Sequence, residues 1–322
     1  MSTLDSTFAG EAETALAGSA PSARARRGRG WRSRGARPTS WTGWLFVLPA
    51  LIMYLVFVIR PMIATIQYSF YDWNGITAAT PVGLANYTRV LTDPLLLASV
   101  GHSFFLMIFY TILPVIGGLV VAALIQEIKM RGLGTVARTT LFIPQIIPGA
   151  AAAIAWVWMF SSNGAVNQLL SAVGLESLTR AWLGDFTWAL PSVGVIGWWL
   201  GLGFCTILLM AGIGKIDVSI YEAARLDGAG FVRTFRSVTL PGLRQEVGVC
   251  VTVTMIAALA SFDVVFMSTQ GGPGTSTMVP GVLIYELGFT RSQVGLASAL
   301  GVVLTALILA VILPIQRFFR ED

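Results

Sequence analysis

Polar and small residues between positions 219 and 241 have the spacing of a short helix followed by a sharp turn. Ser219 and Glu222 form a capping-box pattern, so a helix is expected to begin near Ser219. Gly228 can end or turn this helix, and Pro241 marks the entry to the next apolar segment. Three side chains can form its packing face: Tyr221, Ala224 and Leu226. The chemistry indicated is docking against another protein, although an ordinary amphipathic connector would show the same local pattern.

The sequence lacks the loop that binds nucleotide phosphates. In G-x-x-x-x-G-K-[ST], backbone amides and a lysine hold the phosphates. The run Gly214-Lys215-Ile216 lacks the hydroxyl residue, and the run from Gly271 to Gly274 lacks the lysine. Any ATPase must therefore be a separate chain, and no cofactor or metal is expected in this one. Cys205 and Cys250 lie in apolar segments, where small buried residues are expected rather than a disulfide or a metal site.

Long apolar stretches must position these residues. The chain of 322 residues is 55% apolar and 11% charged, too apolar for an ordinary soluble domain. A membrane-spanning helix needs about 20 mostly apolar residues, and runs such as Gly301 to Ile312 lack the alternation of a transmembrane β-strand. Six stretches qualify: Trp44 to Phe70, Ser99 to Gln126, Thr139 to Phe160, Trp188 to Ile213, Val247 to Met267 and Gly295 to Ile315. The sequence therefore predicts an all-α membrane protein with six transmembrane helices.

The basic residues favour one topology. With a cytoplasmic N-terminus, the connections Lys129 to Arg138 and Lys215 to Arg244 and the C-terminal tail share one side, and four arginines lie outside: Arg60, Arg89, Arg180 and Arg291. The positive-inside rule then predicts that both termini are cytoplasmic and that residues 65–98, 161–187 and 268–294 lie outside. This topology explains the net charge of +5 without nucleic acid, for which no binding module is present. Residues 1–40 are expected to form a disordered, Arg-rich cytoplasmic tail, and 41–322 the transmembrane domain.

Few ionisable residues fall within the predicted spans. Proton- or ion-coupled transporters usually carry carboxylates or histidines at mid-membrane depth. Here Asp263 and His102 lie toward outer ends, and Glu127 at a cytoplasmic end. Energy coupling is therefore expected to come from elsewhere. Prolines such as Pro144 and Pro148 are compatible with a kinked bundle that has an internal cavity, but composition leaves transporter, channel and scaffold open.

One segment resembles the signature loop of binding-protein-dependent ABC importer permeases: Glu222-Ala223-Ala224-Arg225-Leu226-Asp227-Gly228 with Leu240-Pro241. The Asp227-Gly228-Ala229 triplet is typical of the sugar-importing branch. Further motifs of that branch follow in order: Leu48-Pro49-Ala50, Arg60-Pro61, Ser69 to Trp73, Gly83 to Tyr87, Phe142-Ile143-Pro144, Phe262-Asp263, Gly271 to Gly274 and Gly295 to Ala299. The resemblance covers residues 44–317 and is to the maltose, glycerol-3-phosphate and multiple-sugar permeases, which implies the type I importer fold.

The resemblance also implies partners. These are a second similar permease, two ATPase subunits that hold ATP and magnesium, and an extracytoplasmic binding protein that delivers a sugar or similar polar solute. In that family the loop helix docks in a cleft of the ATPase subunit, and the loop is residues 215–244 here. The coupling role is thereby carried onto Glu222, Ala223, Ala224, Asp227 and Gly228. Gln270 stands where the family commonly has glycine, and the extra periplasmic domain of the maltose permease has no counterpart. An ion-coupled secondary transporter and a non-transporting membrane scaffold or channel remain the alternatives.

In this family the solute cavity forms between spans four and five. Sugar sites pair aromatic faces, which cover C–H surface, with hydroxyl, amide or carboxylate groups. The candidates are Trp198, Trp199, Phe204, Thr254, Ser261 and Asp263, and Gly197 and Gly201 could supply room beside them. Adjacent tryptophans cannot both face one cavity, so one of the two is expected there. Each tryptophan can instead face lipid or belong to an interfacial belt, and Thr254 can instead bond its own backbone.

Overall fold

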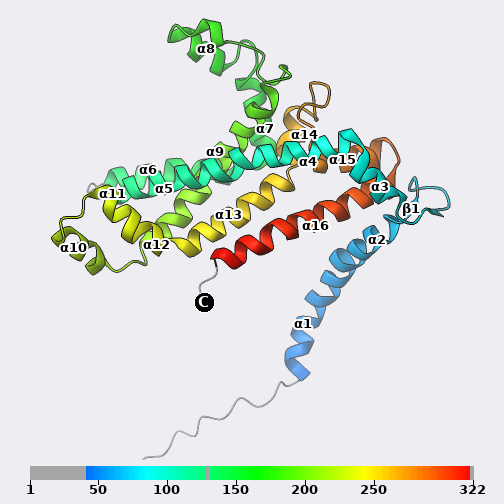
Figure 1. Cartoon of the computed structure of the whole chain (residues 1–322), viewed down its shortest axis with the longest axis horizontal. Helices are drawn as coiled ribbons and strands as arrows, with labels where there is room; N and C mark the ends of the chain where they lie inside the picture. The colour runs from blue at the N-terminus through cyan, green and yellow to red at the C-terminus, as the bar shows by residue number, and fades with distance from the viewer. Residues whose placement is uncertain (1–40, 128–130, 320–322) are drawn as a thin grey trace, which may run out of the picture. The chain divides into compact units, whose positions relative to one another are not determined.

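The computed structural model describes residues 41–127 and 131–319, in which the regular elements are helices apart from one two-stranded ladder (Figure 1). In that ladder β1 (Tyr71–Asp72) pairs antiparallel with β2 (Thr80–Pro81). By internal contacts the chain forms two units, Met1–Tyr54 and Leu55–Asp322. The described part of the first unit is the helix α1 (Trp41–Tyr54). The predicted tail, residues 1–40, lies outside the described residues.

The second unit holds the remaining elements. It begins with η1 (Leu55–Ile59) and α2 (Arg60–Tyr68), and α3 (Ala85–Thr92) follows the ladder. Then follow α4 (Pro94–Met107), η2 (Ile108–Ile112), α5 (Leu113–Glu127), α6 (Arg131–Ile146), α7 (Gly149–Met159), α8 (Ala165–Ala172), η3 (Glu176–Leu178) and α9 (Ala189–Ile213). The last part comprises α10 (Val218–Leu226), α11 (Phe231–Thr234), η4 (Phe235–Thr239), α12 (Leu240–Gly242), α13 (Arg244–Leu259), α14 (Asp263–Ser268), α15 (Pro280–Tyr285), η5 (Glu286–Thr290) and α16 (Val294–Phe319).

Among the described residues, four helical runs are long and apolar enough to cross a membrane: Trp44–Tyr68, Pro94–Gln126, Ala189–Ile213 and Val294–Phe319. Two bent pairs pass the same test together: Thr139–Ile146 with Gly149–Met159, and Phe231–Gly242 with Arg244–Leu259. Each bent pair counted as one span gives six. The predicted all-α membrane fold is therefore confirmed.

The stretch from Thr139 to Phe160, expected as one helix, bends by 104° between α6 and α7. Pro148 stands at the bend with an extended ψ of 136°. Proline lacks an N–H and disfavours the helical conformation of the residue before it. Pro144, by contrast, lies inside α6. The helix therefore stops at the second proline and continues past the first.

The stretch from Val247 to Met267 is also broken, because α13 ends at Leu259 and α14 begins at Asp263. Neither proline nor glycine occurs at this break. The helix α15 crosses here, and a Cβ added to Gly281 would lie 2.6 Å from the carbonyl oxygen of Ser261. Such an approach requires glycine. The break therefore coincides with a tertiary contact that periodicity does not reveal.

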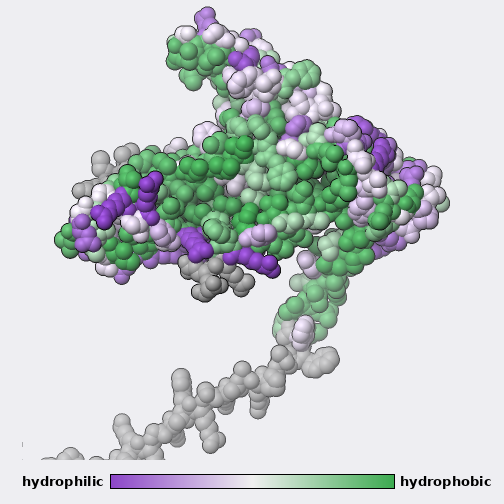
Figure 2. All heavy atoms as spheres, viewed as in Figure 1, coloured by the Kyte–Doolittle hydropathy of each residue, from purple (hydrophilic) through white to green (hydrophobic). Residues whose placement is uncertain are grey.

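The helix α9 packs at the centre of the bundle, against α5, α6, η2 and α13. Two apolar clusters form the core, one that includes Val193 and Leu283 and another that includes Leu209 and Leu243. Hydrophilic side chains gather around α10 to α12 at one end and around α3 at the other, with apolar side chains between (Figure 2). This distribution is that of a bundle whose middle faces lipid.

Candidate functional site

A cavity of about 390 Å³ lies where the two helix breaks meet. The helices α7 and α14 pack against each other. A Cβ added to Gly149 would lie 3.7 Å from a methyl group of Val264 and 4.0 Å from the Cβ of Asp263. The wall also includes α9, with Gly197 and Gly201, and Tyr110 of η2. Ends of broken helices expose backbone groups that can bind solutes, and such breaks are tolerated where they line a cavity.

Four of the six residues expected at a solute site line this cavity: Phe204, Thr254, Ser261 and Asp263. Asp263 is exposed and lies in the first turn of α14, whereas Ser261 and Thr254 are buried. The Thr254 hydroxyl donates to the backbone oxygen of Cys250 at 2.8 Å. Its hydrogen is thus committed to its own helix, which leaves the oxygen as an acceptor.

Neither of the two expected tryptophans is among the lining residues. Trp198 is 37% exposed. Trp199 packs edge-to-face on Trp156, with ring centroids 5.8 Å apart. A fully apolar helix such as α9 gives no periodic signal for which face turns inward. The solute-binding argument for this cavity therefore rests on the other four residues.

Sequence reasoning did not propose three of the lining residues as solute contacts: Tyr110, Gln145 and Phe262, of which Phe262 was noted only as part of a family motif. The Tyr110 hydroxyl is buried and has no hydrogen-bond partner among the residues that the structure describes. A buried hydroxyl without a partner is costly. Gln145 had a usable signal, because it is the one amide side chain in the apolar stretch from 139 to 160.

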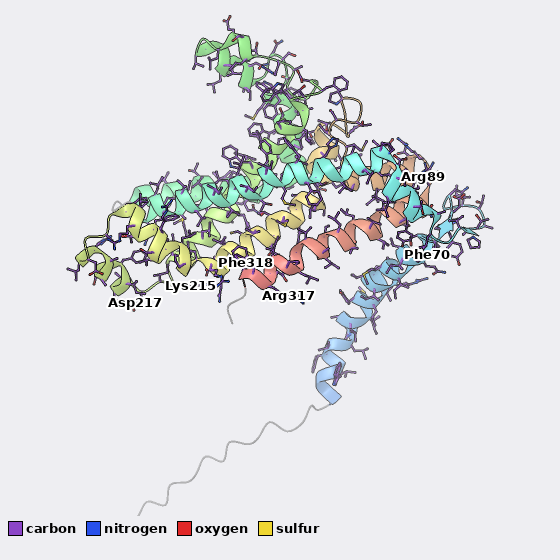
Figure 3. All side chains as sticks on the ribbon, in the orientation of Figure 1. Phe70, Arg89, Lys215, Asp217, Arg317 and Phe318 are labelled. Atoms are coloured by element: carbon purple, nitrogen blue, oxygen red, sulfur yellow. The ribbon has the colours of Figure 1, made fainter. Side chains whose placement is uncertain are left out.

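The second candidate site is α10, at the end of the bundle where Lys215 and Asp217 also lie (Figure 3). Asp217 is the N-cap and accepts a hydrogen bond from the Ser219 N–H at 2.9 Å. This bond holds the pKa of the Asp217 carboxyl below its usual value. The helix therefore begins near Ser219 as predicted, but Asp217 rather than Ser219 is its N-cap. Asp217 also has a side chain suited to N-capping, and with it as the cap Ser219 becomes the second helical residue.

Gly228 ends α10 in the left-handed region, with φ +71°. Its N–H donates to the Arg225 oxygen at 3.0 Å, and the Ala229 N–H donates to the Ala224 oxygen at 2.9 Å. This pair of bonds is the Schellman arrangement that closes a helix C-terminus. The positive φ that the sequence predicted as a possibility is thus present.

The outer face of α10 is open to solvent. Glu222, Ala223, Asp227 and Gly228 are exposed, and Ala224 is partly buried. Leu226, expected on the packing face of this helix, is 89% exposed and is not buried within this chain. Tyr221 is the half-buried residue, with its hydroxyl 3.2 Å from that of Thr239. An exposed leucine beside two carboxylates is a surface that another protein can cover.

An ion pair ties the start of this loop to α13. Lys215 Nζ lies 2.8 Å from Glu246 Oε1, and Glu246 is buried. At the same end, Arg244 donates to the backbone oxygen of Phe318 near the end of α16. Arg317 and Phe318 lie at this end and Arg89 at the opposite one (Figure 3). These polar contacts tie the start of the loop to α13, and α13 to α16.

Comparison with known proteins places α10 and all of the cavity lining except Tyr110 inside one matched region. Residues 115–320 match the family described as "Binding-protein-dependent transport system inner membrane component". The chain is 33% identical to the probable ABC transporter permease protein YurN of Bacillus subtilis, over 86% of this chain and 95% of that protein. It is 32% identical to the diacetylchitobiose uptake system permease protein NgcF of Streptomyces coelicolor (92% and 87%). It is 31% identical to the multiple sugar-binding transport system permease protein MsmF of Streptococcus mutans (83% and 91%).

A solved structure has the same fold. It is the crystal structure of a bacterial ABC transporter involved in the import of the acidic polysaccharide alginate. One of its chains aligns with a TM-score of 0.76 at 23% identity, over 87% of this chain and 95% of that one.

Proposed function

Because this chain belongs to the inner membrane components of binding-protein-dependent transport systems, we propose that it forms, with a second permease, the path for a sugar or related polar solute. The family resemblance noted in the sequence is confirmed by the matched family and relatives. The chain is a multi-pass membrane permease component of an ABC importer. It is a non-catalytic subunit of a family without cofactors. Family membership also removes the secondary transporter and the scaffold or channel from consideration.

The observation that carries the proposal is the cavity at the two helix breaks. Its volume of about 390 Å³ lies within the usual range for small-molecule sites, roughly 300–1,000 Å³. The rings of Phe204 and Phe262 can cover the C–H surface of a sugar. Residues with hydrogen-bonding side chains line the same space: Tyr110, Ser261, Gln145 and Asp263. This mixture suits a neutral polyhydroxylated solute, and the names of the diacetylchitobiose and multiple-sugar relatives point to the same class.

The distribution of basic residues supports a cytoplasmic position for the α10 end and for both termini. Lys215, Arg225, Arg233, Arg236 and Arg244 belong to the loop and to the start of α13, and the positive-inside rule assigns such an end to the cytoplasm. ATP and magnesium would be held there by two separate ATPase subunits. We place their docking surface on α10, with Glu222, Ala223, Ala224, Asp227 and Gly228. A solute-binding protein would deliver the solute from the opposite side.

Transport assays of the assembled importer test the substrate class. The panel would contain radiolabelled maltose, trehalose, N,N′-diacetylchitobiose and glycerol-3-phosphate, with proline and glycine betaine as solutes of other classes. We expect uptake of at least one sugar. We also expect Phe204→Leu and Ser261→Ala to reduce that uptake about tenfold or more, because each removes a contact worth roughly 1.4 kcal/mol. Uptake confined to proline or glycine betaine would refute the sugar assignment, and normal uptake by both variants would refute the cavity.

A further inference from the structure

We propose that Tyr221 is the positioning residue through which movement of α10 reaches α13, by the hydrogen bond between its hydroxyl and that of Thr239. The inference rests on the proposed docking of α10 on an ATPase subunit. It adds a route by which displacement of the docked helix enters the membrane-spanning part of the chain.

Hollows separate α10 from the bundle on two sides. One cavity of about 130 Å³ lies toward α5, α11 and η4, and another of about 380 Å³ lies toward the end of α9. Three side chains line both: Gln126, Tyr221 and Arg225. Close-packed side chains transmit a displacement because they are nearly incompressible, whereas empty space does not. Apart from the two backbone connections of α10, a push or pull therefore passes through the side chains that bridge the hollows.

Tyr221 connects α10 to a buried residue of the bundle, Thr239. Its hydroxyl lies 3.2 Å from Thr239 Oγ1. Thr239 is only 3% exposed and is the last residue of η4. The chain continues directly from Thr239 into α12 and then α13. A displacement of Tyr221 therefore acts on the cytoplasmic start of the helix that ends at the solute cavity.

The ion pair between Lys215 and Glu246 gives the same loop a second contact. Its atoms are 2.8 Å apart, and Glu246 lies in the first turn of α13. The Lys215 side chain is 74% exposed, so the pair contributes modestly, and it links the start of the loop to α13. Tyr221 and Lys215 thus contact the segment from η4 to α13 at two separate positions, Thr239 and Glu246, and a movement of α10 acts on this segment through Tyr221.

The test uses the assembled complex in proteoliposomes, with ATP and orthovanadate as the probe. A reporter cysteine replaces the exposed cavity residue Val253, and serine replaces Cys205 and Cys250. In the parent we expect vanadate trapping to change the rate of maleimide labelling of Val253→Cys at least threefold. In Tyr221→Phe and in Thr239→Val that change should shrink to below a third of the parental value, while vanadate still traps nucleotide. Tyr221→Phe keeps the ring, so altered packing does not produce this result.

Three further variants sharpen the test. Thr239→Ser keeps a hydroxyl and should restore the reporter response. The double variant of Tyr221→Phe and Thr239→Val should show a reporter response no smaller than that of either single variant, because both substitutions remove the same hydrogen bond. Tyr87→Phe is the matched control, since it removes a similar hydroxyl pair, to Ser69 at 2.6 Å, at the opposite end of the bundle. It should leave the response unchanged.

The failures are distinguishable. A parental complex that does not retain the ATPase subunits contradicts the proposed function. A parent that traps nucleotide without any reporter response, or a Tyr221→Phe variant with the full response, overturns this inference and leaves the proposed function standing. An equal loss in Tyr87→Phe also overturns it, because the effect would then not be specific to α10.

Discussion

Replacing Gly228 by valine perturbs one turn without crowding its surroundings. A Cβ at this position would meet no atom within 4 Å, so the cost comes from the backbone, which has φ +71°. An L-residue in the left-handed helical region costs about 1–2 kcal/mol, and a β-branched residue is a strong outlier there. The chain can relieve this strain only by giving up the two hydrogen bonds that close α10. A penalty of about 1–2 kcal/mol corresponds to a roughly 5- to 30-fold lower population of the docking conformation.

Solute-stimulated ATP hydrolysis and co-purification of the ATPase subunits measure this effect. We expect Gly228→Val to reach the membrane at the parental level, because the turn is exposed and lies outside the spans. Stimulated hydrolysis should fall about fivefold or more. Gly228→Asn is the matched control, because asparagine tolerates the left-handed region, and it should retain most activity. Glu222→Lys, which reverses an exposed charge on the same helix, should also weaken docking.

The comparison between valine and asparagine decides the matter. If both variants hydrolyse ATP at the parental rate, the turn at Gly228 does not position a docking helix. If both variants lose stimulated ATP hydrolysis to the same extent, the loss comes from adding a side chain at position 228 rather than from the backbone conformation. Loss of Gly228→Val from the membrane would show instead that the turn is needed for folding.

Three further predictions concern the cavity, the topology and the cap. Asp263→Ala should lower sugar uptake at least tenfold and Asp185→Ala less than twofold, and equal effects would contradict the solute role of Asp263. A cysteine at Ser219, in a chain whose native cysteines are replaced, should resist an impermeant maleimide added to intact cells, while one at Phe289 should react; the reverse pattern would invert the topology. The Ser219 amide lowers the pKa of the Asp217 carboxyl below its ordinary value of 3.8. The ionised carboxylate that caps the helix is therefore present above pH 3.8 and is lost only as the pH falls through this lowered pKa. Asp217→Ala should therefore reduce stimulated ATP hydrolysis by the same factor at pH 6 and pH 8, and a factor that changes between them would refute this account.

The sequence was sufficient for the class of fold because its strongest signals are additive over many residues. Six apolar stretches and an ordered set of motifs do not depend on how any single side chain packs. The break at Pro148 was also accessible, since proline acts through its own backbone. Which of two prolines breaks the helix was not, because Pro144 continues it.

The cavity was harder to predict, because it depends on contacts between distant segments. The break before Asp263 faces Gly281 of α15, and nothing in its own sequence marks it. The inward face of α9 likewise has no polar periodicity, so Phe204 and the two tryptophans could not be ranked. Asp217 and Ser219 are both good capping residues, and the choice between them followed from where the preceding helix ends.

The positions of the two sites on one helix suggest how they can communicate. α13 has 16 residues and is therefore about 24 Å long. Its start adjoins Thr239 and Leu243, and its end adjoins the break with Ser261 at the cavity. A tilt of about 10° about one end of a rod of that length moves the other end by about 4 Å, which exceeds the size of a water molecule. The bend of 70° before α13 and the break after it mean that neither end is continued by a coaxial helix, so a tilt of α13 is opposed by its packing against α16, α4 and α9 rather than by a continuous helix axis. A displacement of this size at Ser261 is enough to open or close a cavity of about 390 Å³, without any change inside α13 itself.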